Sequence, residues 1–283
     1  MLCSEKELGI SESHEGIMDI KDPIEPGTDL KDLHGEIIFE VSLTPNLNHC
    51  SSVFGVAREL SACLGLSATQ PSVSNQSPAN NSIHDHLQVH VENTDNCPRY
   101  SCRIIQGVTI APSPKWLQQR LIACGQRPIN NIVDATNYVL MELGHPLHAF
   151  DLNRLEGKKI IVKDVKDETF TTLDGLSHKI EKESLCICDE KKPIALAGIM
   201  GGKNSEVDEN TKDIVIESAY FLPSPVRKVS KSLGIQTEGS KRFERGCNPN
   251  QVLLSLERVC SLIQEIAGGS ILEDFVDIKK QDF

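Results

Sequence analysis

Residues 124–151 say more about local structure and a functional site than any other segment, because they combine a helical apolar pattern with a high density of polar side chains. Apolar residues recur on one helical face over 132–143, Gly144 is placed to end the helix in a left-handed conformation, and Pro146 prevents the helix from resuming. We therefore predict a helix over 132–143, followed by a loop that carries His148. Pro146 restricts the backbone ahead of His148, which favours an imidazole aimed into a functional site. The alternative is a histidine whose polar atoms are satisfied by a neighbour.

The composition is typical of a soluble globular protein. The chain has 283 residues, of which 39% are hydrophobic and 24% are charged. No run approaches the roughly 18 apolar residues that cross a bilayer, and the first residues are polar and acidic, unlike a secretory signal. We therefore expect a cytosolic location and no membrane partner.

Ten cysteines are scattered along the chain. Cys63, Cys124 and Cys260 occupy positions where helical periodicity favours a small apolar residue, so we predict that they are reduced core thiols. Cys186 and Cys188 alternate on one predicted strand, and no second Cys or His pair follows at zinc spacing. The sequence therefore predicts no metal site in this chain.

The charge is distributed unevenly. The formal net charge of −11 argues against a nucleic-acid partner, yet residues 219–246 carry +4 and the remainder −15. This basic segment, which includes Lys241 and Arg242, is typical of a protein that contacts a polyanion at one place. A solvated helix face is the alternative that the charge pattern leaves open.

Residues 1–87 divide into three parts. Residues 1–35 are acidic and contain helix-breaking prolines and glycines, so they are predicted to be irregular. Residues 36–66 predict a strand over 36–43, then a turn and a helix that ends at Gly65. The predicted core positions of that helix are Val53, Val56, Ala57, Leu60 and Leu64. Residues 67–87 are rich in Ser, Asn, Gln and Pro and predict a linker.

Residues 88–283 predict a single module of strands and helices. We expect strands over 102–110, 159–165, 185–189, 193–199, 213–219 and 271–278, and helices over 114–124, 132–143, 225–233 and 249–267. Three helices are predicted to begin with a polar cap followed by proline and to end at a glycine: Ser113, Ser224 and Asn248 are the caps, and Gly125, Gly234 and Gly268 the ends. Strands and helices do not alternate regularly, so the sequence favours an α+β fold class with mixed sheets and packed helices over a doubly wound parallel sheet.

Three further features accompany His148. Residues 195–202 place small residues after a strand, which allows a ligand to approach the backbone closely. Glu217 lies in an apolar strand, where a buried carboxylate needs a donor or a ligand; the alternative is an edge-strand glutamate that points to water. Residues 236–246 combine the hydroxyls of Thr237 and Ser240 with Gly239 and basic side chains.

The chain resembles the β subunit of bacterial phenylalanyl-tRNA synthetase through six segments: LTPN (43–46), GVARELSACLG (55–65), VDATNYVLMELGHPLHAFD (133–151), LDG (173–175), AGIMGG (197–202) and TEGSKRFERG (237–246). The resemblance runs in register from Glu36 onward. It implies a fragment in which residues 1–35 are a remnant of an oligonucleotide-binding-fold tRNA domain with a connector. Residues 36–66 would be a remnant of the N-terminal structural domain, and residues 88–283 the editing module.

This resemblance implies tRNA binding and hydrolytic editing of tyrosine mischarged on phenylalanine tRNA, within an α2β2 enzyme whose α subunit attaches phenylalanine. ATP and Mg²⁺ would then serve the holoenzyme, with no cofactor in this chain and no ligation by this chain alone. A pocket shaped for phenylalanine rejects an added hydroxyl by only about 10²-fold, so a second pocket that binds the hydroxyl is needed. The alternative is a non-catalytic structural or tRNA-docking module that has lost editing.

The resemblance also implies a role for ten residues. His148 would be catalytic by orienting or deprotonating a water near the ester, and Thr237 by helping to hold that water. Glu217 would bind the phenol of the tyrosine. The other assignments are Gly201, Gly239, Asn137 and Thr136 for the substrate, and Arg127, Arg242 and Lys241 for the tRNA.

The chain departs from the family pattern at two of these places. His145 stands where the family usually carries Gln, which would add a second titrating group to the site. Gly239 stands where the family usually carries Ala, which would enlarge the mouth of the pocket and relax the exclusion of phenylalanine.

Overall fold

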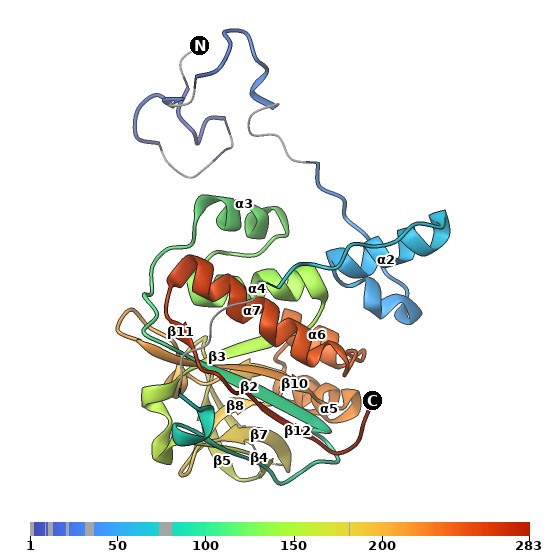
Figure 1. Cartoon of the computed structure of the whole chain (residues 1–283), viewed down its shortest axis with the longest axis vertical. Helices are drawn as coiled ribbons and strands as arrows, with labels where there is room; N and C mark the ends of the chain where they lie inside the picture. Colours follow the sequence, from blue (N-terminus) through green and yellow to red (C-terminus); the bar gives the residue numbers. More distant parts are fainter. Residues whose placement is uncertain are drawn as a thin grey trace. The chain divides into compact units, whose positions relative to one another are not determined.

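The computed structural model describes residues 3–8, 10, 14–20, 23–31, 37–73, 81–180 and 182–283. The chain forms two units, Met1–Val41 and Ser42–Phe283. The described residues of the first unit form turns, bends and a short helical turn, with no strand among them. All helices and strands named below belong to the second unit (Figure 1).

The predicted strand over 36–43 is wrong for the part that can be examined. Residue 36 lies outside the described residues, and residues 37–43 belong to no strand. Ile37 and Phe39, whose alternation suggested the strand, are both exposed. An alternating pattern forms a strand only where a second strand takes up its backbone hydrogen bonds, and no partner is found among the described residues.

The helix after the TPN turn is confirmed, but its core is not. The 3₁₀ helix η1 (Pro45–Cys50) leads into α2 (Val53–Leu64), which ends at Gly65 in the left-handed conformation. Val53 is 67% exposed and Leu60 is 56% exposed, so the predicted apolar face is open to solvent in this chain. Helical periodicity identifies an apolar face without saying what covers it.

The centre of the second unit is an antiparallel sheet in the order β11-β2-β10-β3, with β12 also paired to β2. Its strands are β2 (Arg99–Gln106), β3 (Leu147–Asp151), β10 (Asp213–Tyr220), β11 (Ser270–Ile271) and β12 (Val276–Lys279). On one face lie α4 (Asn131–Leu143) and α7 (Gln251–Ala267), which form an apolar cluster with Ile105, Ile214 and Ile216 (Figure 1).

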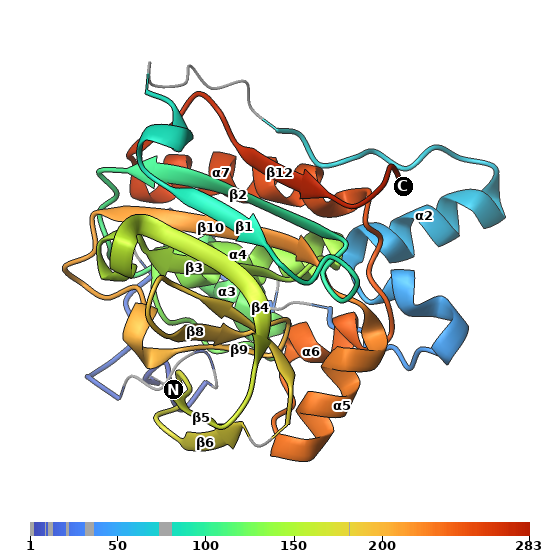
Figure 2. The same ribbon diagram turned by 90° about the horizontal axis from the view of Figure 1, so that it is seen from below.

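A second sheet covers the other face of the central one. It runs β1-β4-β7-β8-β9, with β1 parallel to β4 and the other pairs antiparallel. Its strands are β1 (Gln88–Val91), β4 (Lys159–Val165), β7 (Ser184–Cys188), β8 (Pro193–Leu196) and β9 (Met200–Gly201). Phe150, Val215 and Ile187 belong to the apolar core between the two sheets, which lie in front of α4 and α7 in Figure 2. The α+β fold class with mixed sheets is therefore confirmed.

The remaining elements surround this three-layer body. They are α3 (Lys115–Ala123), α5 (Pro223–Leu233), α6 (Glu238–Phe243), the hairpin β5 (Glu168–Thr171) and β6 (Ser177–Ile180), and the 3₁₀ helices η2 (Ile83–Asp85), η3 (Leu152–Arg154), η4 (Glu156–Lys158) and η5 (Lys203–Ser205). In the described part of the chain, no helix is both long and apolar enough to cross a membrane.

The segment after Pro146 is a strand, so the predicted loop is wrong. Gly144 ends α4 in the left-handed conformation as predicted, but β3 begins at Leu147 and pairs with β10 along its whole length. A proline at the start of an edge strand costs no ladder hydrogen bond, which is why the chain can extend directly from it. His148 is therefore held by a sheet and not by a loop.

Several helix ends and the bounds of several strands differ in detail from prediction. The helices expected at 114–124, 225–233 and 249–267 exist, but their N-caps are Pro114, Leu222 and Asn250, and no side chain caps them. The strand predicted over 271–278 is divided into β11 and β12. The helix ends differ by one or two residues, as is common for helix termini. The larger differences are of three or four residues: the strand predicted over 102–110 is β2 (Arg99–Gln106), and residues 272–275 separate β11 from β12.

Two of the three predicted core thiols are wrong. Cys63 and Cys124 are exposed and only Cys260 is buried. Both exposed thiols lie at the last turn of a helix that other elements cover only in part, so periodicity alone overestimates their burial. Cys63, Cys124 and Cys260 are all free thiols.

Candidate functional site

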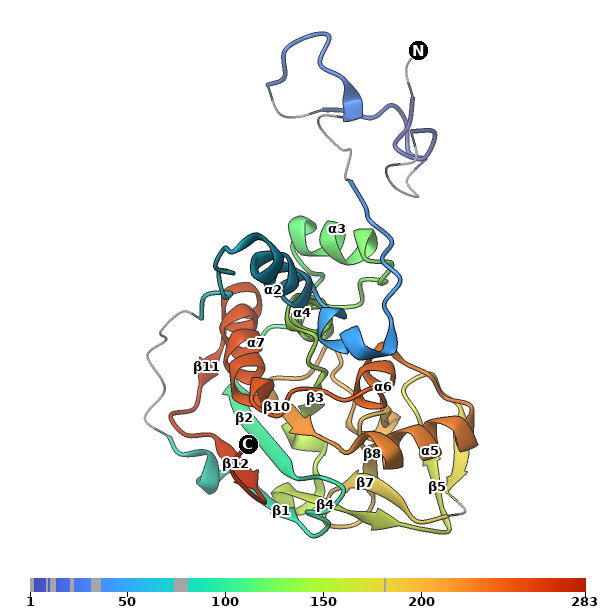
Figure 3. The ribbon, with the colours of Figure 1, turned by 90° about the vertical axis from the view of Figure 1, so that its right-hand side faces the viewer.

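The larger of two adjoining cavities, which is the main one for the predicted site residues, lies between the open edges of the two sheets. It has a volume of about 410 Å³ and is walled by α4, the start of β3, the β8–β9 turn and the first residues of α6. Figure 3 shows α4, β3, β8 and α6 around this region. Six of the ten predicted site residues line it: Thr136, Asn137, His148, Gly201, Thr237 and Gly239.

His148 and Glu217 occupy directly opposite positions on β3 and β10. Side chains at paired positions of antiparallel strands project from the same face of the sheet. Both residues also line a smaller cavity of about 80 Å³, together with Gly201 and Gly239. This smaller cavity shares those glycines and His148 with the main one, so the two predicted functional groups face a common space.

The imidazole of His148 is neutral and partly unpaired. Burial lowers the pKa of His148 to about 4, so it carries no charge near neutral pH. Its Nε2 atom is buried without a hydrogen-bond partner in the described part of the chain. The edge of the ring packs on Phe150, with centroids 4.5 Å apart. A buried polar nitrogen without a protein partner is typical of an atom that meets a ligand or a water.

Gly201 makes room for His148. A β-carbon at Gly201 would overlap Cε1 and Nε2 of the imidazole. The resemblance assigned this glycine to the substrate ring, but the space it leaves is filled by the protein's own histidine. Gly201 therefore positions His148.

Glu217 is buried, with 7% of its surface exposed, so of the two alternatives that the sequence left open the buried carboxylate is the one observed. Burial raises the pKa of Glu217 to about 7, in spite of a hydrogen bond from Tyr100 that lowers it. The phenol of Tyr100 donates that bond to Oε2 over 2.7 Å. Oε1 has no hydrogen-bond partner among the described residues, so one oxygen of the carboxyl group is free to meet a ligand.

Tyr100 is a site residue that sequence reasoning missed. It is fully buried on β2, and burial raises its pKa, so its phenol stays a donor. In the sequence it is an aromatic residue in a strand, which is typical of a core position. Only the pairing of β2 with β10, which sets Tyr100 opposite Ala219, brings it within reach of Glu217.

The helix α4 presents two polar side chains to the cavity in different states. The hydroxyl of Thr136 donates to the carbonyl of Val133 at 2.7 Å, so its proton is used within the helix. The amide of Asn137 has no partner among the described residues. Asn137 is therefore the better placed of the two to bind a ligand.

Thr237 holds the start of α6. Its Oγ1 accepts from the backbone N–H of Ser240 at 3.0 Å and donates to the carbonyl of Ile199 at 2.8 Å. A hydroxyl has one proton and two lone pairs, so Thr237 retains one acceptor position for a water. Gly239, two residues later, would tolerate a β-carbon, whose nearest neighbours are Pro146 Cβ at 3.5 Å and Thr237 Oγ1 at 3.7 Å.

The predicted tRNA-binding residues are not equivalent. Arg242 is buried, and its guanidinium donates to the Glu238 carboxylate at 2.8 Å and to the carbonyl of Ser51 at 2.9 Å. We therefore withdraw Arg242 as a tRNA contact. Lys241 is exposed and bonded to Glu238 at 2.7 Å. Arg127 is exposed next to the cavity residue Gln126 and has no ion pair to a described residue.

The prediction that His145 adds a second titrating group to the site is wrong. His145 is fully buried and is not part of the cavity walls. Its ring meets the edge of Phe243, and burial lowers the pKa of His145 to about 4. A histidine without access to the cavity cannot exchange protons with a substrate there.

Comparison with known proteins gives three results. Residues 96–268 match the family described as "B3/4 domain". The chain is 49% identical to the phenylalanine–tRNA ligase beta subunit of Protochlamydia amoebophila over 284 residues, covering 100% of this chain and 35% of that protein. It is 46% identical to the same subunit of Thermotoga maritima over 285 residues, covering 98% of this chain and 35% of that protein.

The chain thus spans about a third of the length of the curated relatives that it matches. Among solved structures, an N-terminal fragment of the phenylalanyl-tRNA synthetase beta subunit from Pyrococcus horikoshii matches with a TM-score of 0.46 and 16% identity. That match covers 85% of this chain and 65% of the fragment.

Proposed function

This chain belongs to the B3/4 domain family, and on that premise we propose that its cavity hydrolyses tyrosine mischarged on phenylalanine tRNA, as part of a phenylalanine–tRNA ligase beta subunit. The observation that carries the proposal is the pairing of His148 with Glu217 across β3 and β10, because it sets a neutral imidazole and a buried carboxyl group on one cavity. A volume of about 410 Å³ falls within the range of small-molecule sites.

Glu217 supports selection of tyrosine. A tyrosyl phenol can hydrogen-bond Oε1, the carboxyl oxygen that Tyr100 leaves free. A phenylalanyl ring offers no such bond, so its entry would leave a buried polar group without a partner at a cost of about 1–3 kcal/mol. Glu217 therefore acts as the selector in this proposal.

His148 supports the hydrolytic step. A pKa of about 4 makes its imidazole a weak base, so it is better suited to orienting a water than to removing a proton outright. Thr237 offers the same water a free acceptor position, and Asn137 faces the cavity with its amide unused. An aminoacyl ester is already activated, so positioning of the water near the carbonyl carbon can supply much of the rate.

The wider assignments follow from the same proposal. The α subunit and phenylalanine tRNA would be partners, ATP and Mg²⁺ would serve ligation elsewhere in the enzyme, and the complex would act in the cytosol. Arg127 and Lys241 remain the proposed tRNA contacts at the surface. Residues 88–283 would be the editing module.

The test measures whether the purified chain removes tyrosine from phenylalanine tRNA that has been mischarged with it. We expect hydrolysis well above the rate in buffer, with His148→Ala reducing it by about 10²-fold or more. A rate equal to that in buffer, with tRNA binding retained, would instead support the structural or tRNA-docking role. Phenylalanyl-tRNA serves as the matched control substrate, because it lacks only the phenolic hydroxyl.

A further inference from the structure

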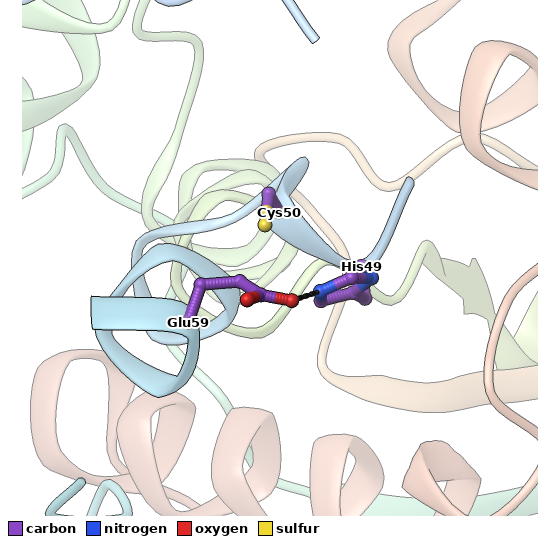
Figure 4. A group of neighbouring side chains, drawn as sticks. All are labelled: His49, Cys50 and Glu59. Atoms are coloured by element: carbon purple, nitrogen blue, oxygen red, sulfur yellow. Dashed lines mark hydrogen bonds and ion pairs between the residues drawn. The ribbon is translucent and has the colours of Figure 1, made fainter. Parts of the chain in front are cut away.

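A second group of reactive side chains lies outside both cavities, where η1 meets α2. His49 and Cys50 end η1, and Glu59 projects from the second turn of α2 (Figure 4). One ligand atom from each residue, an imidazole nitrogen, the thiol Sγ and a carboxylate oxygen, lies within 4.8 Å of the other two. It is the one group of three such ligands within the ranges that the structure describes.

The three side chains differ in burial and in bonding. Cys50 is buried, whereas the side chains of His49 and Glu59 are 45% and 42% exposed. His49 Nε2 is hydrogen-bonded to Glu59 Oε1. An ion from solvent would therefore meet the exposed imidazole and carboxylate, and the sulfur lies within 4.8 Å of their ligand atoms.

The backbone that carries the group is fixed from several sides. Ser52 caps α2 by accepting from the N–H of Gly55 at 3.0 Å, and a β-carbon at Gly55 would overlap the carbonyl of His49. Asn48 donates to the carbonyl of Gly246 at 2.5 Å, and Arg242 donates to the carbonyl of Ser51. His49 and Cys50 are thus anchored on both sides, which lowers the entropic cost of binding an ion.

We propose that His49, Cys50 and Glu59 form a binding site for a divalent transition-metal ion of the zinc class. Nitrogen, sulfur and oxygen ligands in this combination suit Zn²⁺ or Co²⁺, while Mg²⁺ and Ca²⁺ prefer oxygen ligands alone. Three protein ligands leave the fourth tetrahedral position to water.

Binding involves one proton and small side-chain movements. The Cys50 thiol releases its proton to solvent as the metal–sulfur bond forms, and the His49–Glu59 hydrogen bond opens to admit the ion. An ordinary thiol is protonated at neutral pH, so an ion must displace that proton to bind the sulfur. The resulting thiolate and the Glu59 carboxylate balance the charge of the dication.

The experiment is equilibrium dialysis of the purified chain with Zn²⁺. We expect one ion per chain, and Cys50→Ser, His49→Ala and Glu59→Gln should each weaken binding by about tenfold or more, since even partners outside the ligand shell are worth 10–100-fold. Cys63→Ser is the matched control, because this exposed thiol lies on α2, the helix that carries Glu59, and is outside the group. It should bind Zn²⁺ as the wild type does.

Two further measurements distinguish the loss of a metal ligand from unfolding of a variant. Co²⁺ bound to the wild type should show a thiolate-to-metal charge-transfer band that is absent from Cys50→Ser. Each variant should unfold at the wild-type temperature in the presence of a chelator, and Glu59→Gln is the mildest because its side chain is half exposed. The proposal is overturned if the wild type binds no Zn²⁺, or if correctly folded Cys50→Ser and Glu59→Gln bind it as tightly as the wild type.

Discussion

Tyr100 donates a 2.7 Å hydrogen bond from its phenol to Oε2 of Glu217, so the protein's own tyrosine occupies one oxygen of the carboxyl group proposed to bind the substrate phenol. Tyr100 is fully buried, and it fixes the orientation of Glu217. The carboxyl group is therefore presented to the cavity through Oε1 alone. The Tyr100–Glu217 pair therefore affects the stability of the fold, the pKa of Glu217 and the selection of the substrate. The first three predictions test these three effects.

Glu217→Gln should reduce the preference for tyrosyl over phenylalanyl tRNA more than it slows hydrolysis of either ester. The amide keeps an acceptor for Tyr100 but loses the carboxylate that favours a phenolic donor. Glu217→Ala should show the same loss of preference and should also destabilise the fold by about 1–3 kcal/mol, because the phenol of Tyr100 is left unpaired. Deacylation rates with both esters measure the effect, and equal slowing on both would contradict the selector role.

Tyr100→Phe should raise the pKa of Glu217 above its value of about 7. The substitution removes the hydrogen bond that lowers this pKa and leaves the burial that raises it. A carbon-13 NMR titration of the glutamate carboxyl group measures the change. A pKa that stays at or below the wild-type value would show that the bond to Tyr100 does not stabilise the carboxylate.

The free energy of unfolding should depend on pH through Glu217. Its folded pKa of about 7 lies above the value of 4.5 for a free glutamate, so the folded state binds the proton more tightly. Its contribution is fully present below pH 4.5 and is lost as the pH rises through 7, by about 3 kcal/mol in total.

Glu217→Gln provides the control for this measurement, since it lacks the titrating group. Denaturant unfolding of both proteins between pH 4 and pH 8 should show the stability of the wild type falling relative to the variant. A difference that is constant over this range would indicate that Glu217 has an ordinary pKa.

Gly201→Ala and Gly239→Ala should have opposite outcomes, although the two glycines line the same cavities. A β-carbon at Gly201 would overlap the His148 imidazole, so Gly201→Ala should displace that ring, abolish deacylation and cost about 1–3 kcal/mol. A β-carbon at Gly239 meets neighbours at 3.5 Å or more, so Gly239→Ala should fold normally and narrow the cavity mouth. Deacylation assays and thermal unfolding compare the pair, and equal effects at the two positions would contradict the geometry.

Substitutions of Arg127 and Arg242 should have different effects, the first on tRNA binding and the second on the stability of the fold. Arg127→Gln should weaken tRNA binding and lower the slope of its salt dependence by about one, because the exposed guanidinium is free to meet a phosphate. Arg242→Gln should leave that slope unchanged and destabilise the fold, because the Glu238 carboxylate loses one of its two donors and the carbonyl of Ser51 loses the guanidinium. Filter binding across a salt series and thermal unfolding distinguish the two, and a reduced slope for Arg242→Gln would restore it as a tRNA contact.

Local sequence patterns are enough to predict many elements of this chain. The end of α4 at Gly144 and the end of α2 at Gly65 follow from the conformational freedom of glycine, and β4 coincides with its prediction over 159–165. The burial of Glu217 follows from the apolar residues that surround it in β10. Each of these properties depends on residues that are close in the sequence.

Pairing between distant segments decides the rest. His148 meets Glu217 because β3 pairs with β10 in one register, and a shift of one residue would send either side chain to the opposite face. Tyr100 joins them from β2, whereas Arg242 is withdrawn from the surface by Glu238 and Ser51. The local pattern states which side chains are available, but long-range hydrogen bonds and packing determine which of them share a cavity.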